Sequence, residues 1–122
     1  MVDRDMGTAE AEQLGESLWL LRLVGENDLS TASSLNQALH RIEQTGTTVV
    51  VDFCDAVFVD SSVIGALIKQ QQRGETLLLV APQRCRVRRS LDLMGLTQKM
   101  PTFESREEAL REASSQPSTS SP

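Results

Sequence analysis

The chain has 122 residues, which is enough for one domain with a single modest core, and only 3% of them are aromatic. Its formal net charge of −5 argues against nucleic acid as the default partner and gives no support for binding to an anionic membrane. No apolar run approaches the roughly 20 residues that a membrane-spanning helix needs, and the N-terminus, MVDRDMGTAEAEQLGE, lacks the apolar centre of a signal peptide. We therefore expect a cytoplasmic protein with an aliphatic core.

The two cysteines give no metal or redox motif by their spacing. Cys54 and Cys85 have no CxxC partners, and His40 is the only histidine, so no set of metal ligands is recognised. We expect two reduced, partly buried thiols, no metal and no cofactor. A redox disulfide between the two thiols is the alternative, and sequence spacing does not decide between these states.

The first patterned segment, residues 18–24 (LWLLRLV), is short, apolar and closed by Gly25, and it predicts a strand. Alternation places three apolar side chains on one face of it: Trp19, Leu21 and Leu23. The polar residues 1–13 before it are expected to fray or to form an edge strand. A polar turn, GENDLSTA, follows the strand, and Ser30 or Thr31 can cap the next helix. Apolar residues at helical spacing indicate that helix: Leu35, Ala38, Leu39 and Ile42.

Two apolar runs in the middle of the chain predict strands that are covered on both faces. Residues 48–53 are almost wholly apolar until Asp52, and residues 77–80 are apolar throughout. Between them, the AVFVD segment predicts a short extended stretch that leads into Asp60-Ser61-Ser62. A helix is expected next, because four apolar residues recur at helical spacing: Val63, Ile64, Leu67 and Ile68.

The last third of the chain predicts two more helices. Residues 83–94 have apolar side chains at helical spacing, and a short extended piece over residues 99–103 follows. Ser105 and Glu108 form a capping-box pattern at the start of the final helix. Residues 114–122 are rich in serine and proline, and we expect them to be a disordered tail.

This alternation of strands and helices predicts an α/β fold in which the helices pack on one sheet. We expect a small mixed sheet of four to five strands with about four helices, formed by residues 14–113. Connections between parallel strands of this length are expected to be right-handed.

The sequence Asp60-Ser61-Ser62 places one carboxylate and two hydroxyls at a predicted helix start. The first N–H groups of a helix have no intrahelical partner, and the helix dipole favours negative charge there. A phosphate on either serine would therefore lie where the backbone tolerates it best. On these three residues alone, an ordinary N-cap is the more frequent explanation, because Ser and Asp are preferred at that position.

Three motifs occur in one order along the chain: GENDLSTA at residues 25–32, VDFCDAVFVDSSVIGALI at residues 51–68, and LDLMGL at residues 91–96. Together they resemble the STAS domain of anti-sigma factor antagonists. That family has a G-E-L-D-x-x-T-A turn after an early strand, then a buried strand leading to D-S-S/T-G-L-G at a helix start, and a late helix ending near G-L. The resemblance covers residues 19–113 and implies a STAS-like fold.

The resemblance implies a regulatory binding protein and not an enzyme. An antagonist of this family binds an anti-sigma factor that is also a GHKL-type serine kinase, and binding frees the sigma factor. The kinase phosphorylates the first hydroxyl residue after the motif aspartate, which inactivates the antagonist, and a PP2C-type phosphatase restores it. By position, the acceptor in this chain is Ser61. The implied partner-binding residues are Glu26, Asp28, Ser30, Asp60, Ser61, Ser62 and Val63.

Two positions depart from the family pattern. Val63 stands where the pattern has glycine, and we expect its β-branched side chain to narrow the approach to the acceptor serine. Asn27 replaces the usual leucine of the turn, so we expect an apolar plug to be missing there. Apart from the resemblance, Glu26 and Asp28 are equally well explained as the solvated acidic edge of a turn.

The sequence also leaves other functions open. STAS modules occur as subunits of lipid-transporting ABC complexes, in which case the partner would be an ATPase complex. A receiver domain or a small enzyme fits less well, because the first strand ends at Val24-Gly25 and Lys99 lies past the last strong strand, and no nucleophile–base pair or phosphate-binding loop is found. A run of four arginines is most simply explained as a solvated surface, and some of them are expected to pair with carboxylates or with a partner: Arg84, Arg86, Arg88 and Arg89.

Overall fold

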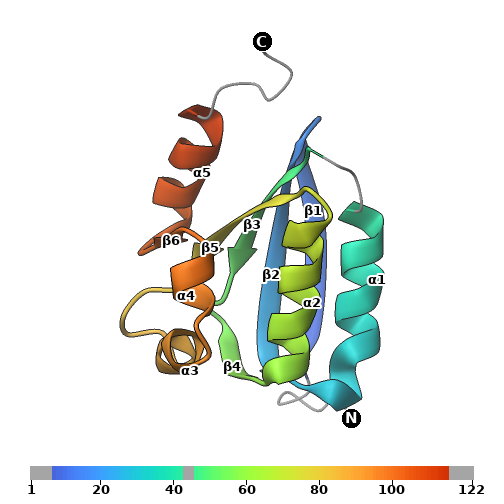
Figure 1. Cartoon of the computed structure of the whole chain (residues 1–122), viewed down its shortest axis with the longest axis vertical. Helices are drawn as coiled ribbons and strands as arrows, with labels where there is room; N and C mark the ends of the chain where they lie inside the picture. The colour runs from blue at the N-terminus through green and yellow to red at the C-terminus, as the bar shows by residue number, and fades with distance from the viewer. Residues whose placement is uncertain (1–6, 43–45, 116–122) are drawn as a thin grey trace.

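The computed structural model describes residues 7–42 and 46–115, which form an α/β fold with six strands, five α-helices and one 3-10 helix (Figure 1). In chain order these elements are β1 (Thr8–Gly15), β2 (Leu18–Asn27), η1 (Leu29–Thr31), α1 (Ala32–Ile42), β3 (Thr48–Asp52), β4 (Ala56–Val59), α2 (Ser61–Gln72), β5 (Thr76–Val80), α3 (Arg88–Leu93), α4 (Leu96–Lys99), β6 (Thr102–Phe103) and α5 (Arg106–Ser115). The α/β prediction is confirmed, with one strand and one helix beyond the expected numbers.

The sheet is mixed, as expected, and its strand order is β1-β2-β3-β5-β6. β1 lies antiparallel to β2 at one edge, and the other neighbouring strands are parallel. β2 pairs in parallel with two strands: its residues 18–22 pair with β3, and its residues 25–27 pair with β4. The register shifts at Gly25, whose φ of 76° is a left-handed conformation that suits glycine. This shift lets β4 continue along the end of β2 toward α2.

The helices cover the two faces of the sheet unequally. Buried residues of α1 to α4 belong to one core and those of α5, within the described residues, to the other. Figure 1 shows α1 and α2 on the opposite side of the strands from α5. Alternate side chains of β2 supply both cores: Trp19, Leu21 and Leu23 lie in the larger core under α1 to α4, and Leu20 lies in the smaller core under α5. The two faces that alternation predicts for this strand are therefore confirmed.

The helix expected over residues 83–94 is shorter in the structure. α3 begins at Arg88, and the residues before it form turns in which the Cys85 N–H donates to Pro82 O (2.9 Å) and the Arg88 N–H donates to Cys85 O (3.1 Å). The Cys85 thiol donates to Phe53 O at 3.2 Å, and Val87 is buried. These contacts hold residues 83–87 against the end of β3, so this segment forms turns and the helix starts only after it.

The ends of the chain lie partly outside the described residues. α5 extends through Ser115, two residues into the segment expected to be disordered, and residues 1–6 and 116–122 lie outside the description. At the start of α5, the Ser105 hydroxyl accepts from the Glu108 N–H (3.1 Å), as the capping pattern predicts. The Glu108 carboxylate accepts from the N–H of Glu104 (3.2 Å) and not from that of Ser105, so the box is displaced by one residue.

A buried carboxylate attaches α5 to the sheet. Asp52 ends β3 and is 5% exposed, and its carboxylate accepts from Arg106 Nη2 (2.8 Å), Arg106 Nε (3.1 Å) and the Cys54 N–H (2.8 Å). Burial alone would raise the pKa of Asp52, but the hydrogen bonds from Cys54 and Arg106 outweigh burial and hold this pKa below its usual value. The carboxylate is therefore ionised at neutral pH and can pair with the guanidinium.

Replacing Arg106 with alanine should lower the free energy of unfolding by about 1–3 kcal/mol, because it leaves a buried carboxylate without two charge-assisted hydrogen bonds. The matched control is Arg111→Ala on the same helix, whose side chain is 70% exposed and pairs with an exposed Glu107. This control should change stability by less than about 0.5 kcal/mol. Urea unfolding at neutral pH measures both variants, and equal effects would contradict the role given to Asp52.

The same pair predicts a pH dependence. Because the folded-state pKa of Asp52 is lowered, its contribution is present above the unfolded pKa of about 3.9 and is lost as the pH falls through the folded pKa. The stability difference between the wild type and Arg106→Ala should therefore shrink in acid. A difference that stays constant from neutral pH down to acid unfolding would show that the carboxylate is not responsible.

Candidate functional site

The two serines at the β4–α2 junction, Ser61 and Ser62, have different environments. Asp60 follows β4 and is the N-cap of α2, where its carboxylate accepts from the Ser62 N–H (3.0 Å) and from the Ser62 hydroxyl (2.5 Å). Ser61 is the first residue of the helix and is exposed, and its hydroxyl has no hydrogen-bond partner among residues 7–42 and 46–115. Ser61 is therefore available for chemistry, whereas the oxygen of Ser62 is already bound.

The turn after β2 repeats this arrangement. Asp28 is the N-cap of η1, and its carboxylate accepts from the Ser30 N–H (2.9 Å) and from the Ser30 hydroxyl (2.6 Å). The Thr31 hydroxyl accepts from the Asp28 N–H at 3.0 Å and completes a capping box. Ser30 and Thr31, the residues expected to cap the next helix, thus belong to the 3-10 helix η1 directly before α1, and the cap of η1 is Asp28.

Asp60 connects the two turns. Its N–H donates to Asn27 O at 3.2 Å, which extends the β2–β4 pairing by one bond. The hydrogen bond from the Ser62 side chain, followed by those from the backbone, holds the pKa of Asp60 below its usual value, so this group is negative at neutral pH. The two sequence motifs, about 30 residues apart in the chain, therefore meet through the backbone of Asp60.

The structure places the sequence-predicted site residues in three environments. Glu26, Ser30 and Ser61 are exposed, and Asp28, Asp60 and Ser62 are half-buried in the two caps. Val63 lies in the larger core with 2% of its surface exposed, so its side chain points away from the exposed face of the junction. The expectation that Val63 narrows the approach to the serine is therefore wrong, because this helix position faces the sheet.

Asn27 stands where the family pattern has leucine, and the structure buries this position with the polar side chain of the asparagine. Asn27 is 1% exposed, and its amide donates to Val24 O (3.1 Å) and to Gly25 O (3.4 Å). These bonds hold the end of β2 in its turn. The apolar plug is thus replaced by an amide that satisfies local carbonyl groups.

Two exposed apolar side chains near the junction were missed by sequence reasoning. Leu29 is 74% exposed and follows Asp28, and Phe58 is 47% exposed and pairs in register with Glu26. Large apolar side chains at the surface are informative when they gather beside polar groups. The available signal was a leucine inside an otherwise polar turn and an aromatic residue in a four-residue strand. We name these exposed residues the turn surface: Glu26, Leu29, Ser30, Phe58 and Ser61.

The comparison with known families agrees with this geometry. A family model described as the STAS domain matches residues 9–109. The chain belongs to the STAS domain family. None of the curated proteins compared with it matches the sequence.

Solved structures share the fold of this STAS domain. An anti-sigma factor antagonist from Mycobacterium paratuberculosis has a TM-score of 0.71 and 22% sequence identity, covering 92% of this chain and 97% of that chain. The anti-sigma factor antagonist SpoIIAA in its unphosphorylated form has a TM-score of 0.66 and 22% identity, covering 90% and 99%. The Bacillus cell fate determinant SpoIIAA in its phosphorylated form has a TM-score of 0.59 and 22% identity, covering 87% and 99%. The expected fold is confirmed by this likeness.

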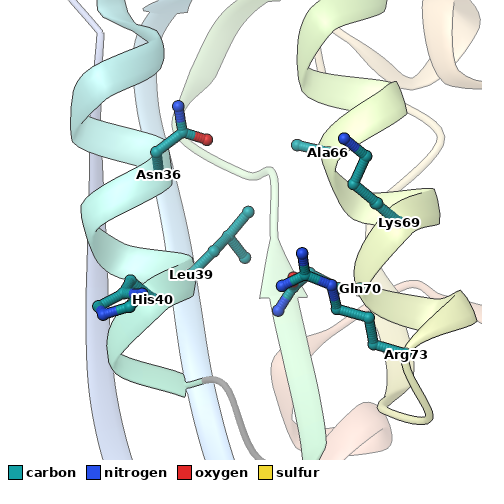
Figure 2. A pocket seen from close by; sticks show the side chains of 7 residues that line it. All are labelled: Asn36, Leu39, His40, Ala66, Lys69, Gln70 and Arg73. Carbon is teal, nitrogen blue, oxygen red and sulfur yellow. The ribbon is translucent and has the colours of Figure 1, made fainter.

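A hollow of about 320 Å³ lies between α1 and α2, near the end of α2 that is remote from Ser61. Figure 2 shows the side chains of Lys69 and Arg73 reaching into the space between the two helices. The amide of Gln70 is buried there and donates to Glu75 at 2.9 Å. Basic side chains at the end of a helix offset the negative end of its dipole, which accounts for this arrangement.

Two other classes of site find no support in the described part of the chain. Within residues 7–42 and 46–115, no three His, Cys, Asp or Glu side chains are grouped so that they could hold a metal ion. In the same residues, no helix combines the length and the apolar character needed to cross a bilayer.

The Asp60 cap gives a stability prediction. Asp60→Ala should lower the free energy of unfolding by about 1 kcal/mol, because the first turn of α2 loses its cap and the Ser62 N–H loses its acceptor. Ser61→Ala, one residue away, should change stability by less than about 0.5 kcal/mol, because the Ser61 hydroxyl makes no described bond. Denaturant unfolding followed by circular dichroism measures both. A larger loss from Ser61→Ala than from Asp60→Ala would contradict the assignment of the cap.

Proposed function

We propose that this STAS domain is an anti-sigma factor antagonist that is switched off by phosphorylation of Ser61. Its partner would be an anti-sigma factor with a GHKL-type serine kinase domain, and binding would free a sigma factor. A PP2C-type phosphatase would reverse the modification, and the domain itself acts by binding and not as an enzyme. The observation that carries the proposal is the exposed, unengaged Ser61 hydroxyl beside a serine that Asp60 already holds.

The position of Ser61 suits a charge switch. A phosphate adds a charge of about −1.5 to −2 at neutral pH. At the first turn of α2 the positive end of the helix dipole tolerates this charge, so the domain stays folded. The neighbouring Asp60 is already ionised, and Glu26 and Asp28 lie in the adjoining turn. A partner docked here would have to pair or desolvate the added charge, which weakens the complex.

The composition of the turn surface supports a protein partner. Leu29 and Phe58 offer apolar area that a partner can bury, and Glu26, Ser30 and Ser61 supply a polar surround. Protein interfaces commonly combine a few buried apolar anchors with a polar rim. The structural likeness to anti-sigma factor antagonists supports the same class of partner.

A phosphorylation assay tests the acceptor directly. Incubation of the full chain with candidate GHKL-type serine kinases and ATP should place one phosphate on Ser61, as mapped by mass spectrometry, and Ser61→Ala should carry none. Ser62→Ala is the control and should still be phosphorylated, because its hydroxyl is engaged by Asp60 and is not the acceptor. A phosphate on Ser62 in the wild type, or none with every kinase tested, would contradict the proposal.

The charge switch predicts a binding difference. Ser61→Asp should weaken binding to the kinase partner by about tenfold to a hundredfold, and Ser61→Ala should bind like the wild type. The control for added charge is Ser114→Asp, an exposed position on α5, which should leave the affinity unchanged. Calorimetric titration measures all three. Purification with a transporter ATPase in place of a kinase would favour a subunit of a lipid-transporting complex.

A further inference from the structure

A second cavity lies beside β4, on the side of the β3–β4 connection. It has a volume of about 480 Å³ and is lined by two segments: Cys54, Asp55, Ala56 and Val57 on one side, and Pro82, Arg84, Cys85 and Arg86 on the other. These segments follow the carboxyl ends of the parallel strands β3 and β5. Open α/β sheets bind ligands preferentially at this edge. We name this space the arginine cavity.

Two guanidinium groups of the arginine cavity have no counter-charge. Arg84 and Arg86 are exposed and have no ion-pair or hydrogen-bond partner among residues 7–42 and 46–115. Arg88, two residues further on, differs from them, because it bonds to Asp92 (3.1 Å) and lies 3.5 Å from Glu104. The structure thus neutralises one arginine of the basic run and leaves the two that line the cavity free.

The remaining titratable groups of the cavity do not cancel this positive charge. The Asp55 carboxylate is already paired with Arg22 at 2.9 Å. Burial, followed by the hydrogen bond and charge of the adjacent Asp52, raises the pKa of the Cys54 thiol to about 12, so this thiol is neutral at physiological pH. The Cys85 thiol donates to a backbone oxygen. The lining therefore carries two guanidinium groups and one carboxylate, and that carboxylate is bound to Arg22.

An apolar wall completes the cavity. Ala56, Val57 and Pro82 are the apolar residues of its lining, and Val57 is 39% exposed. Pockets for small molecules are commonly built from apolar walls with a few convergent polar groups. A wall of this kind favours a ligand with a hydrocarbon part over a bare inorganic ion.

We propose that the arginine cavity binds a small organic anion, with its phosphate or carboxylate on the guanidinium groups of Arg84 and Arg86 and its apolar part against Val57. Planar guanidinium groups bind both of these anions through paired hydrogen bonds. This proposal does not depend on the proposed antagonist function, because no residue of the turn surface lines the cavity.

Titration of the full-length, nitrogen-15-labelled protein tests the site by NMR, with phenyl phosphate and benzoate as the anionic probes and benzyl alcohol as the neutral one. At least one of the two anions should shift the amides of Cys54, Val57 and Cys85, and benzyl alcohol should not. The probe with the higher affinity, phenyl phosphate or benzoate, shows whether the site prefers a phosphate or a carboxylate. The double variant Arg84→Ala/Arg86→Ala should weaken this binding by at least about tenfold.

The matched control is Arg89→Ala, which removes an exposed arginine of the same run that does not line the cavity, and it should bind as the wild type does. Thermal unfolding of each variant verifies that the fold is kept. Absence of cavity shifts with both anions, or equal weakening by Arg89→Ala, would overturn the proposal. Equal affinity for inorganic phosphate and phenyl phosphate would also overturn it, because the apolar wall would then have no part in binding.

Discussion

The arrangement of this domain's candidate site depends on one residue, Asp60. Its main-chain N–H donates to Asn27 O and extends the pairing of β2 with β4, and its side chain caps α2. Two turns that are distant in sequence are therefore fixed relative to each other. The same bonds engage Ser62 and leave Ser61 without a partner in the described structure. Selection of one hydroxyl out of two thus follows from the geometry of an N-cap.

Local patterns in the sequence were enough to predict the fold class and the N-cap at Asp60. The alternation of Trp19, Leu21 and Leu23 with Leu20 predicted the two faces of β2, and the Asp60 cap was recognised from residue type alone. These features depend on periods of two and 3.6 residues and on short-range hydrogen bonds, which a sequence displays directly.

Features set by long-range contacts could not be predicted in the same way. Val63 was expected beside the acceptor, but it faces the core because α2 is oriented by the sheet beneath it. The segment before α3 has helical spacing, yet the Cys85 thiol and the buried Val87 hold it against the end of β3. Leu29 lies in a polar turn, and the periodicity of the sequence did not indicate that its side chain would be exposed.

Charge is distributed unevenly over this acidic chain. The turn surface and its caps carry the carboxylates of Glu26, Asp28 and Asp60, whereas the arginine cavity on the other side of β4 carries two unpaired guanidinium groups. A net charge of −5 therefore conceals two regions of opposite sign separated by a strand of four residues. Electrostatic complementarity mainly sets specificity and association rate, so we expect the two regions to differ in the charge of the molecules that they bind.

The unequal covering of the sheet has a consequence for how the domain opens. α5 contacts β3, β5 and β6 and rests on a small cluster, with the Asp52–Arg106 pair at its first turn. An element with few apolar contacts and one charged attachment is expected to detach before the global transition. Its release would uncover Val50, Leu78 and Val80, an aliphatic strip of the kind that drives self-association. We therefore expect the attachment of α5 to limit aggregation, and we expect the β4–α2 junction that bears Ser61 to stay folded when α5 detaches.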